Sequence, residues 1–355
     1  MSASPFDHPF LSGLLGDAEA SSLFTAEADM RAMLAFESAL AQAEAEAGLI
    51  GRDAADCITT ICQSFAPDYE ALKLATGKDG VVVPELVNQL RKAVGKKHAP
   101  SVHFGATSQD VIDTSLILRL KTLSRILDTR LEAVISALSH LDKKHGAKAL
   151  MGRTRMQPAI PIKVTDRIDA WRDPLIRHRE RLIIQSQALF IVQLGGAAGT
   201  LDRLGSKAVT VRTNLARTLK LGDAPQWHSQ RDRLAEFSSL LSLITGTLGK
   251  FGADIALLAQ LGEIVLDGGG ASSAMSHKQN PVAAELLVTL ARFNAVQLSG
   301  MHLALVHEQE RSGSAWSLEW MLLPQMAIAT AASLNLALSM CSNIKSIGRS
   351  GSDAH

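Results

Sequence analysis

Long stretches of this chain contain no proline, a residue that disrupts helix interiors. They lie between successive prolines and cover residues 101–157, 175–224, 226–280 and 282–323. From Leu116 to Leu141, leucine and valine recur in steps of three and four, as one face of an amphipathic helix requires. The chain is therefore expected to be built around long helices.

A second apolar stripe, from Leu234 to Val265, spreads over more than one helical face and predicts burial among several helices. Alanine and leucine, both good helix formers, dominate the composition. The expected fold class is all-α, a long-helix bundle completed by other subunits. We expect an N-terminal helical domain over 1–100, where glycine and proline separate shorter helices, and a central bundle domain over 101–355.

Three helix boundaries can be predicted from local signals. Asn280 and Pro281 resemble an N-cap and a first helical residue. The last helix is expected from about Trp320 to Ile347, and Pro174 is expected to kink or divide a helix over 165–192.

Charge and cysteine content exclude several classes of protein. The 36 basic and 35 acidic residues give a net charge of +1, which supplies no long-range field for nucleic acid or a membrane surface. Three cysteines without a CxxC pair are interpreted as reduced core thiols. The N-terminus resembles no secretory signal. The segment 234–266, interpreted as the most apolar long one, is interrupted by Lys250, Asp254 and Glu263, which leaves no uncharged run of about 18 residues within it. We therefore expect a cytoplasmic protein without a membrane span.

Residue spacing argues against metal and cofactor sites. Histidine pairs lie five residues apart, which places them on different helical faces instead of aligning them for a metal ion. The run GGAAGT at 195–200 follows an apolar stretch, but it lacks GxGxxG spacing and a surrounding βαβ pattern. We expect neither a metal nor an organic cofactor.

Polar segments interrupt the helical pattern near expected helix starts, where free amide N–H groups favour anions. The first is HFGATSQDVIDT at 103–114, in which the hydroxyl groups of Thr107 and Ser108 and the amide of Gln109 offer hydrogen-bond donors. The alternative is that one of these hydroxyls only caps the following helix.

The second segment, GRTRMQPAIPIK at 152–163, gathers polar side chains in an expected loop fixed by two prolines. Residues 152–181 contain eight Lys or Arg against four Asp or Glu, and guanidinium groups bind carboxylates through paired hydrogen bonds. This pattern favours a polyanionic small molecule, whereas the arginines after Lys163 are better interpreted as a solvated helix face.

The third segment, GGGASSAMSHKQNP at 268–281, follows a long apolar helix and combines glycines with hydrogen-bond donors. A lysine, a histidine and an asparagine at a helix start would stabilise a developing carboxylate anion. A flexible connector is the alternative.

In this order the segments resemble the signature regions of the fumarase/aspartase superfamily of homotetrameric helical enzymes. HFGATSQDVIDT points to the branches that contain adenylosuccinate lyases and 3-carboxy-cis,cis-muconate cycloisomerases, and HEQERSGSAWSLEW at 307–320 resembles the cycloisomerase branch. The resemblance implies a homotetramer whose subunits share sites. It also implies an intramolecular lyase that lactonises a small polycarboxylate, carboxymuconate, in aromatic catabolism.

The resemblance also implies the roles of individual side chains. Ser272 would transfer the proton at carbon and Lys278 would stabilise the charged carboxylate. His103 and His277 are secondary candidates for substrate binding, because a lone histidine is more often structural. The full set of implied substrate-binding residues is Thr107, Ser108, Arg153, Thr154, Arg155, Gln157, Asn280, Arg311, His103 and His277.

The chain departs from the superfamily pattern in ways that bear on the reaction. Arg155 stands where lyases generally carry a catalytic histidine, and the small helical domain that usually follows the bundle is expected to be absent after Ile347. A carboxylate with a reference pKa of about 4 attacks without a base, so lactonisation needs proton transfer only at carbon. Arg155 would then bind a carboxylate. An adenylosuccinate-type lyase and a non-catalytic scaffold of the same fold are the alternatives.

Overall fold

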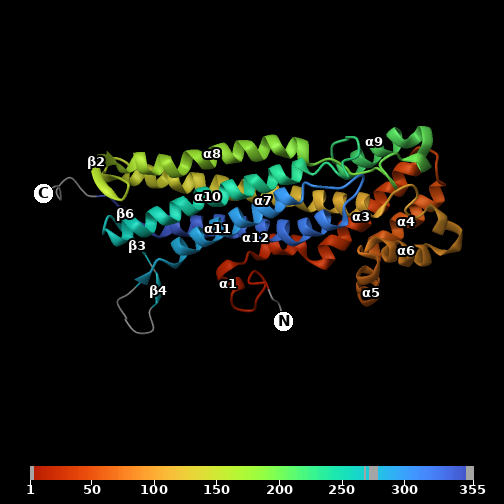
Figure 1. The fold of residues 1–355 in the computed structure, drawn as a ribbon, viewed down its shortest axis with the longest axis horizontal. Coiled ribbons are helices and arrows are strands. Elements are labelled where there is room, and N and C mark those ends of the chain that lie inside the picture. Colours follow the sequence, from red (N-terminus) through yellow and green to blue (C-terminus); the bar gives the residue numbers. More distant parts are fainter. Residues whose placement is uncertain (1–3, 268, 272–278, 349–355) are drawn as a thin grey trace.

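The structure, a computed structural model, describes residues 4–267, 269–271 and 279–348. Long helices lie side by side in an elongated bundle, and a cluster of shorter helices packs at one end (Figure 1). The expected all-α, long-helix fold is confirmed. The bundle helices are α7 (Ser108–His145), α8 (Val164–Leu189), α10 (Asp232–Gln260), α11 (Val282–Leu303) and α12 (Gly313–Asn343).

The apolar stripe predicted on α7 faces the centre of the bundle. From Leu120 to Leu138 its leucines and valine are almost completely buried. An acidic residue in the first turn and Lys143, Lys144 and His145 in the last complement the helix dipole. Gly146 follows the last helical residue, where the sequence predicts the end.

Two bundle helices, α10 and α12, are long and apolar enough to cross a membrane by length and composition alone. In the most apolar stretch of each helix, 50% of α10 and 61% of α12 are buried inside the protein. Burial among neighbouring helices therefore accounts for their apolar character.

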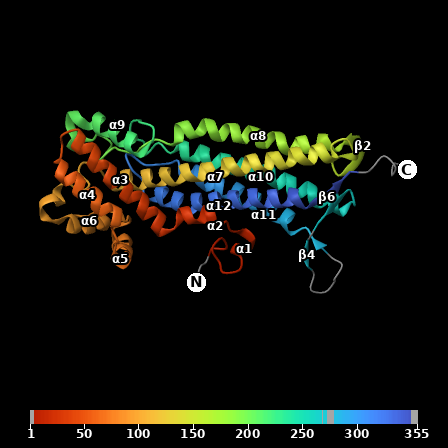
Figure 2. The same ribbon diagram turned by 180° about the vertical axis from the view of Figure 1, so that it is seen from behind.

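The end of the bundle where α7 begins carries a second hydrophobic core (Figure 2). This core combines the N-terminal helices and α9 with Val111 and Ile112 of α7 and Trp316 of α12. It therefore extends across the expected boundary at residue 100, and that boundary stays a prediction. The other helices are α1 (Ser12–Leu15), α2 (Ala18–Ser21), α3 (Ala26–Glu46), α4 (Arg52–Ser64), α5 (Tyr69–Asp79), α6 (Val83–His98) and α9 (Ala208–Leu219), with 3-10 turns at Ser22–Phe24, Ala99–Ser101 and Asp202–Lys207.

Short antiparallel strand pairs lie at the opposite end. The segment expected as a loop at 152–163 is instead a hairpin, because its prolines occupy a two-stranded sheet whose outer edge needs no N–H donor. The pairs are β1 (Ala149–Thr154) with β2 (Gln157–Lys163), β3 (Ile264–Leu266) with β6 (Ile344–Ile347), and β4 (Gly270–Ala271) with β5 (Gln279–Asn280).

Several predicted boundaries differ from the structure. Asn280 is not an N-cap, because it pairs in β5 and Pro281 occupies the cap position. α12 begins at Gly313, before Trp320. Its N-cap is Ser312, whose side chain accepts the N–H of Ala315 at 3.3 Å. The helix gives way to β6 at Ile344. α8 continues through Pro174.

Replacing a buried leucine of α7 tests the packing of the bundle. Leu127 is fully buried, so Leu127→Ala is expected to lower the free energy of unfolding by about 2–5 kcal/mol in guanidinium denaturation. Leu74→Ala, at a side chain that is 76% exposed, is the control and should change it by less than about 0.5 kcal/mol. Equal losses in both variants would contradict the placement of α7.

Candidate active site

The chain turns sharply before it enters α7. Gly105 has φ +72°, and a Cβ there would lie 2.5 Å from the side chain of Leu204, so this turn requires glycine. Thr107 is the N-cap, and its N–H donates to Asp110 Oδ2 at 3.0 Å. Thr107 therefore occupies the capping position, and Ser108 begins the helix. Both side chains are half-buried.

Asp110 is completely buried and receives donors from distant parts of the chain. Its Oδ1 accepts the N–H of Gly195 at 2.8 Å and its Oδ2 that of Gly196 at 2.9 Å. His228 Nε2 lies 2.8 Å from Oδ1. The glycines of GGAAGT thus bind a carboxylate of their own chain, which gives this motif a structural role.

Asp113, one turn further along α7, belongs to a buried ionic cluster. Arg231 donates to both of its oxygens at 2.6 and 3.0 Å and to Glu319 of α12 at 2.9 and 2.5 Å. Trp316 Nε1 also donates to Asp113 at 3.1 Å. Burial disfavours the charged guanidinium, but the charges and hydrogen bonds of Asp113 and Glu319 together outweigh it and raise the pKa of Arg231. Burial also opposes ionisation of Glu319, yet the hydrogen bonds and charges of Arg231 and His307 together bring its pKa below the usual value.

Arg311, a predicted substrate-binding residue, lies against this cluster. Its Nε donates to Gln109 Oε1 at 2.8 Å, and its Nη2 donates to the carbonyl of Ala197 at 3.4 Å. The amide of Gln109 donates in turn to Asp113 at 3.1 Å. The structure therefore brings Arg311 to the same end of the molecule as Thr107 and Ser108.

His103 stands before this cluster with a buried acidic partner. Its Nδ1 lies 2.7 Å from Glu37 Oε1, and its backbone has φ +59°. Burial lowers the pKa of His103, but the charge and hydrogen bond of Glu37 and the charge of Asp110 together more than compensate and raise it. Two helical turns after Glu37 on α3, burial and the charge of Glu37 raise the pKa of Glu44 to about 9.

The hairpin residues lie at the other end of α7. Thr154, Arg155 and Gln157 are exposed at its tip. Arg155 and Met156 form the turn with φ +48° and +66°, a left-handed conformation that usually requires glycine or asparagine. Arg153 instead binds its own chain, since its Nη2 donates to the buried Glu263 at 3.0 Å.

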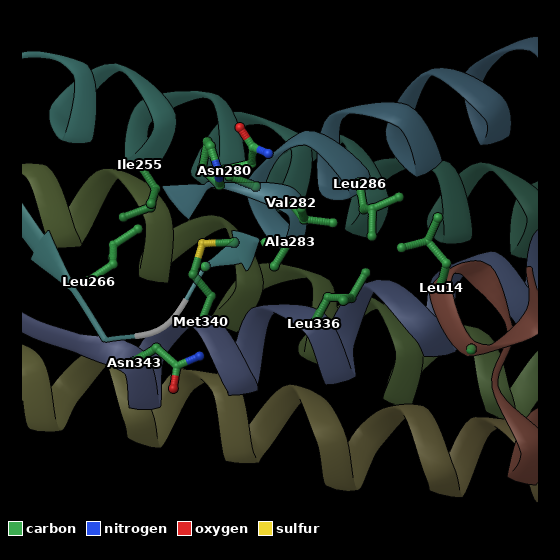
Figure 3. A pocket seen from close by; sticks show the side chains of 15 residues that line it. Leu14, Ile255, Leu266, Asn280, Val282, Ala283, Leu286, Leu336, Met340 and Asn343 are labelled. Atoms are coloured by element: carbon green, nitrogen blue, oxygen red, sulfur yellow. The ribbon is translucent and has the colours of Figure 1, made fainter. Parts of the chain in front are cut away.

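The two groups of predicted site residues cannot meet within one chain. α7 has 38 residues and separates them by about 57 Å at 1.5 Å per residue. Asn280, in the stem of the β4–β5 pair, lines an otherwise mostly apolar cavity of about 390 Å³ between α10, α11 and α12 (Figure 3). Ser272, His277 and Lys278 lie outside the described residues.

No group of three or more His, Cys, Asp or Glu side chains that could hold a metal ion is found among the residues that the structure describes.

Comparison with known proteins identifies the family. A family model described as lyase matches residues 17–296. A 3-carboxy-cis,cis-muconate cycloisomerase of Pseudomonas putida is 39% identical over 324 residues, which are 89% of this chain and 77% of the relative. The chain belongs to this lyase family, that of fumarase and aspartase.

Other members of the lyase family match to similar extents. The crystal structure of 3-carboxy-cis,cis-muconate lactonizing enzyme from Pseudomonas putida has a TM-score of 0.90 at 36% identity and covers 96% of this chain and 77% of that chain. An N-acetyl-S-(2-succino)cysteine lyase of Enterococcus italicus is 33% identical over 94% of this chain and 74% of its own length. The family is thus clear, whereas relatives with different named activities match at comparable identity.

The motif at 103–114 did not point to the carboxylates that organise the α7 end. Asp110 and Asp113 lie inside a motif in which Thr107, Ser108 and Gln109 were expected to offer donors. Their partners Arg231 and Glu319 come from segments far along the chain. A charged residue within an otherwise apolar helical stripe, as at Asp113 and Glu319, was the available signal.

Breaking the ionic cluster should destabilise the lyase strongly. Asp113→Leu leaves Arg231 with one carboxylate partner in a site where its side chain is 1% exposed. Removing one member of a buried ion pair typically costs about 3–5 kcal/mol, which urea denaturation would measure. Asp53→Leu, at an exposed pair with Lys97, is the control and should cost less than about 1 kcal/mol.

Glu44 should make stability depend on pH. Its folded pKa, about 9, lies above the unfolded value, so the folded protein retains a proton that the unfolded chain releases, and stability falls as pH rises between about 4.5 and 9. Glu44→Gln should therefore gain stability over the parent from pH 5.5 to pH 8, by at most about 1.4 kcal/mol per pH unit. Glu70→Gln, at an exposed side chain, should show no such trend. A constant difference at both pH values would exclude a neutral Glu44.

Proposed function

We propose that this lyase-family enzyme is a cycloisomerase that closes 3-carboxy-cis,cis-muconate to a carboxymuconolactone in aromatic catabolism. The observation that carries the proposal is the similarity to cycloisomerases over about nine tenths of the chain, in sequence and in fold. The argument from Arg155 supports it independently.

The reaction forms a C–O bond between a substrate carboxylate and an alkene carbon, and a proton is added at the neighbouring carbon. The attacking carboxylate is already ionised near neutral pH, so no base is required at oxygen. An amine- or hydroxide-expelling lyase would need an acid for its leaving group. The exposed guanidinium of Arg155, at the tip of the hairpin, suits a carboxylate ligand better than proton transfer.

Each proposed residue then has a chemical role. Ser272 transfers the proton at carbon, and Lys278 with Asn280 stabilises the carboxylate into which the carbanion charge spreads. Arg311 and the hydroxyl groups of Thr107 and Ser108 bind further carboxylates. The remaining binding residues are His103, Arg153, Thr154, Arg155, Gln157 and His277.

These roles need more than one copy of the chain, because Arg311 lies beside the start of α7 and Gln157 in the hairpin beyond its end. We propose a homotetramer with shared sites. The surface of the bundle fits association with further copies, since large apolar side chains are exposed on its helices. Examples are Ile184 on α8, Leu243 on α10 and Val296 and Leu303 on α11. We further propose a cytoplasmic location, in agreement with three free cysteines among the described residues.

Ultraviolet absorbance tests the activity directly. We expect the conjugated-diene absorbance of carboxymuconate to decay with the enzyme, while adenylosuccinate and N-acetyl-S-(2-succino)cysteine remain unchanged. Turnover of only one of the latter two would replace the proposal with a β-elimination activity. Inactivity on all three would favour a non-catalytic scaffold.

Subunit mixing tests the shared site. Arg311→Ala and Gln157→Ala should each lower activity, but tetramers reassembled from an equal mixture should regain it in up to about a quarter of their sites. Each variant taken alone through the same dissociation and reassembly is the control. If the mixture stays as inactive as its components, both residues belong to one chain's site or to none.

A further inference from the structure

Both N–H groups and the oxygen of the Gln109 side-chain amide form hydrogen bonds. Gln109 is the second residue of α7 and is completely buried. Its Nε2 donates to Asp113 Oδ2 at 3.1 Å and to the carbonyl of His228 at 2.8 Å, while its Oε1 accepts Arg311 Nε at 2.8 Å. The amide therefore links a buried carboxylate to a half-buried guanidinium.

Charges at both ends fix the orientation of this amide. Its NH₂ group faces the carboxylate of Asp113 and its oxygen faces the cation of Arg311. Turning the amide by 180° would place oxygen against carboxylate and NH₂ against guanidinium, which loses both hydrogen bonds. Asp113 cannot move away to accommodate a turn, because Arg231 binds both of its oxygens.

A buried aspartate of α7 also fixes the second acceptor of Arg311. This acceptor is the carbonyl of Ala197, to which Nη2 of Arg311 donates. Ala197 follows Gly195 and Gly196, whose N–H groups donate to Asp110. The two buried aspartates of α7 thus each fix one acceptor for Arg311. A guanidinium has five N–H donors, and those beyond these two bonds remain for a ligand carboxylate.

We propose that Gln109 is a positioning residue that aims the guanidinium of Arg311 at a carboxylate of the substrate. The identity of that substrate rests on the proposed function, whereas the orientation of Arg311 does not. A neutral acceptor is needed at this position. A carboxylate there would neutralise Arg311, and an apolar side chain would release it.

Gln109→Met, of similar length without polar atoms, removes the acceptor. Because a hydrogen bond to a charged group changes an equilibrium about 10-fold or more, KM for carboxymuconate should rise about 10-fold while kcat changes less. Asn294→Leu removes another buried amide, one that binds Met326 and Thr330 within the bundle, and should leave KM unchanged. A KM of Gln109→Met equal to that of the parent would overturn the proposal.

Gln109→Glu adds a readout that a purely structural role would not move. The protonated acid keeps the bonds to Asp113 and Arg311, since its hydroxyl can donate to the first and its carbonyl can accept from the second, and it loses only the bond to the carbonyl of His228. The ionised form pairs with Arg311 and repels Asp113. The ratio of the KM of Gln109→Glu to that of the parent should therefore be near one at low pH and rise with pH. A ratio that stays constant from pH 5.5 to 8.5 would contradict the proposal. The charged and titratable groups around this position are Asp110, Asp113, His228, Arg231, Arg311 and Glu319.

A measurement without substrate separates this proposal from the proposed function. Phenylglyoxal modifies arginine side chains, and peptide mass spectrometry gives the rate at Arg311. Arg311 should react several-fold faster in Gln109→Met than in the parent or in Asn294→Leu. If this occurs in a protein that does not consume carboxymuconate, the positioning role stands and the substrate is wrong. Equal rates in all three proteins would refute the positioning role whatever the substrate.

Discussion

The burial of Asp110 and Asp113 at the start of α7 is the interaction on which the arrangement of this end of the molecule depends. Moving a carboxylate out of water costs several kcal/mol unless donors replace the lost solvation. Here backbone N–H groups and the positive end of α7 serve Asp110, and the guanidinium of Arg231 serves Asp113. The donors of the two aspartates come from two distant segments, around Gly195 and around Arg231, so those segments must meet at α7 for the charges to be tolerated.

The same cluster joins the two hydrophobic cores. Val111 and Ile112 of α7 belong to the core of the N-terminal helices, whereas Leu116 and Ile117 belong to that of the bundle. Asp113 lies between them, and its partner Arg231 also binds Glu319 of α12. A change in the position of α12 would thus alter the surroundings of Gln109 and Arg311. Core packing and the geometry of the candidate site are connected through these charges.

The sequence predicted the parts of the fold that follow from helical periodicity. The stripe from Leu116 to Leu141 predicted α7 and its end at Gly146, because burial of one face requires that spacing. The hairpin at 152–163 was missed, since its turn consists of Arg155 and Met156, two residues that rarely adopt positive φ. Partners separated by more than a hundred residues, such as Asp113 and Arg231, have no local pattern. Only the folded chain reveals them.

The hairpin tip gives the proposed association with other copies a local physical basis. Consecutive non-glycine residues at positive φ cost of order 1–3 kcal/mol each and persist where surrounding structure determines them. Within one chain the tip is exposed, and Met156 has 75% of its surface accessible. The strain and the exposed side chains are both accounted for if the tip contacts another subunit. Because the length of α7, about 57 Å, separates the hairpin from the end of the bundle where Arg311 lies, that contact would also complete the proposed site, and one hairpin would serve both assembly and substrate binding.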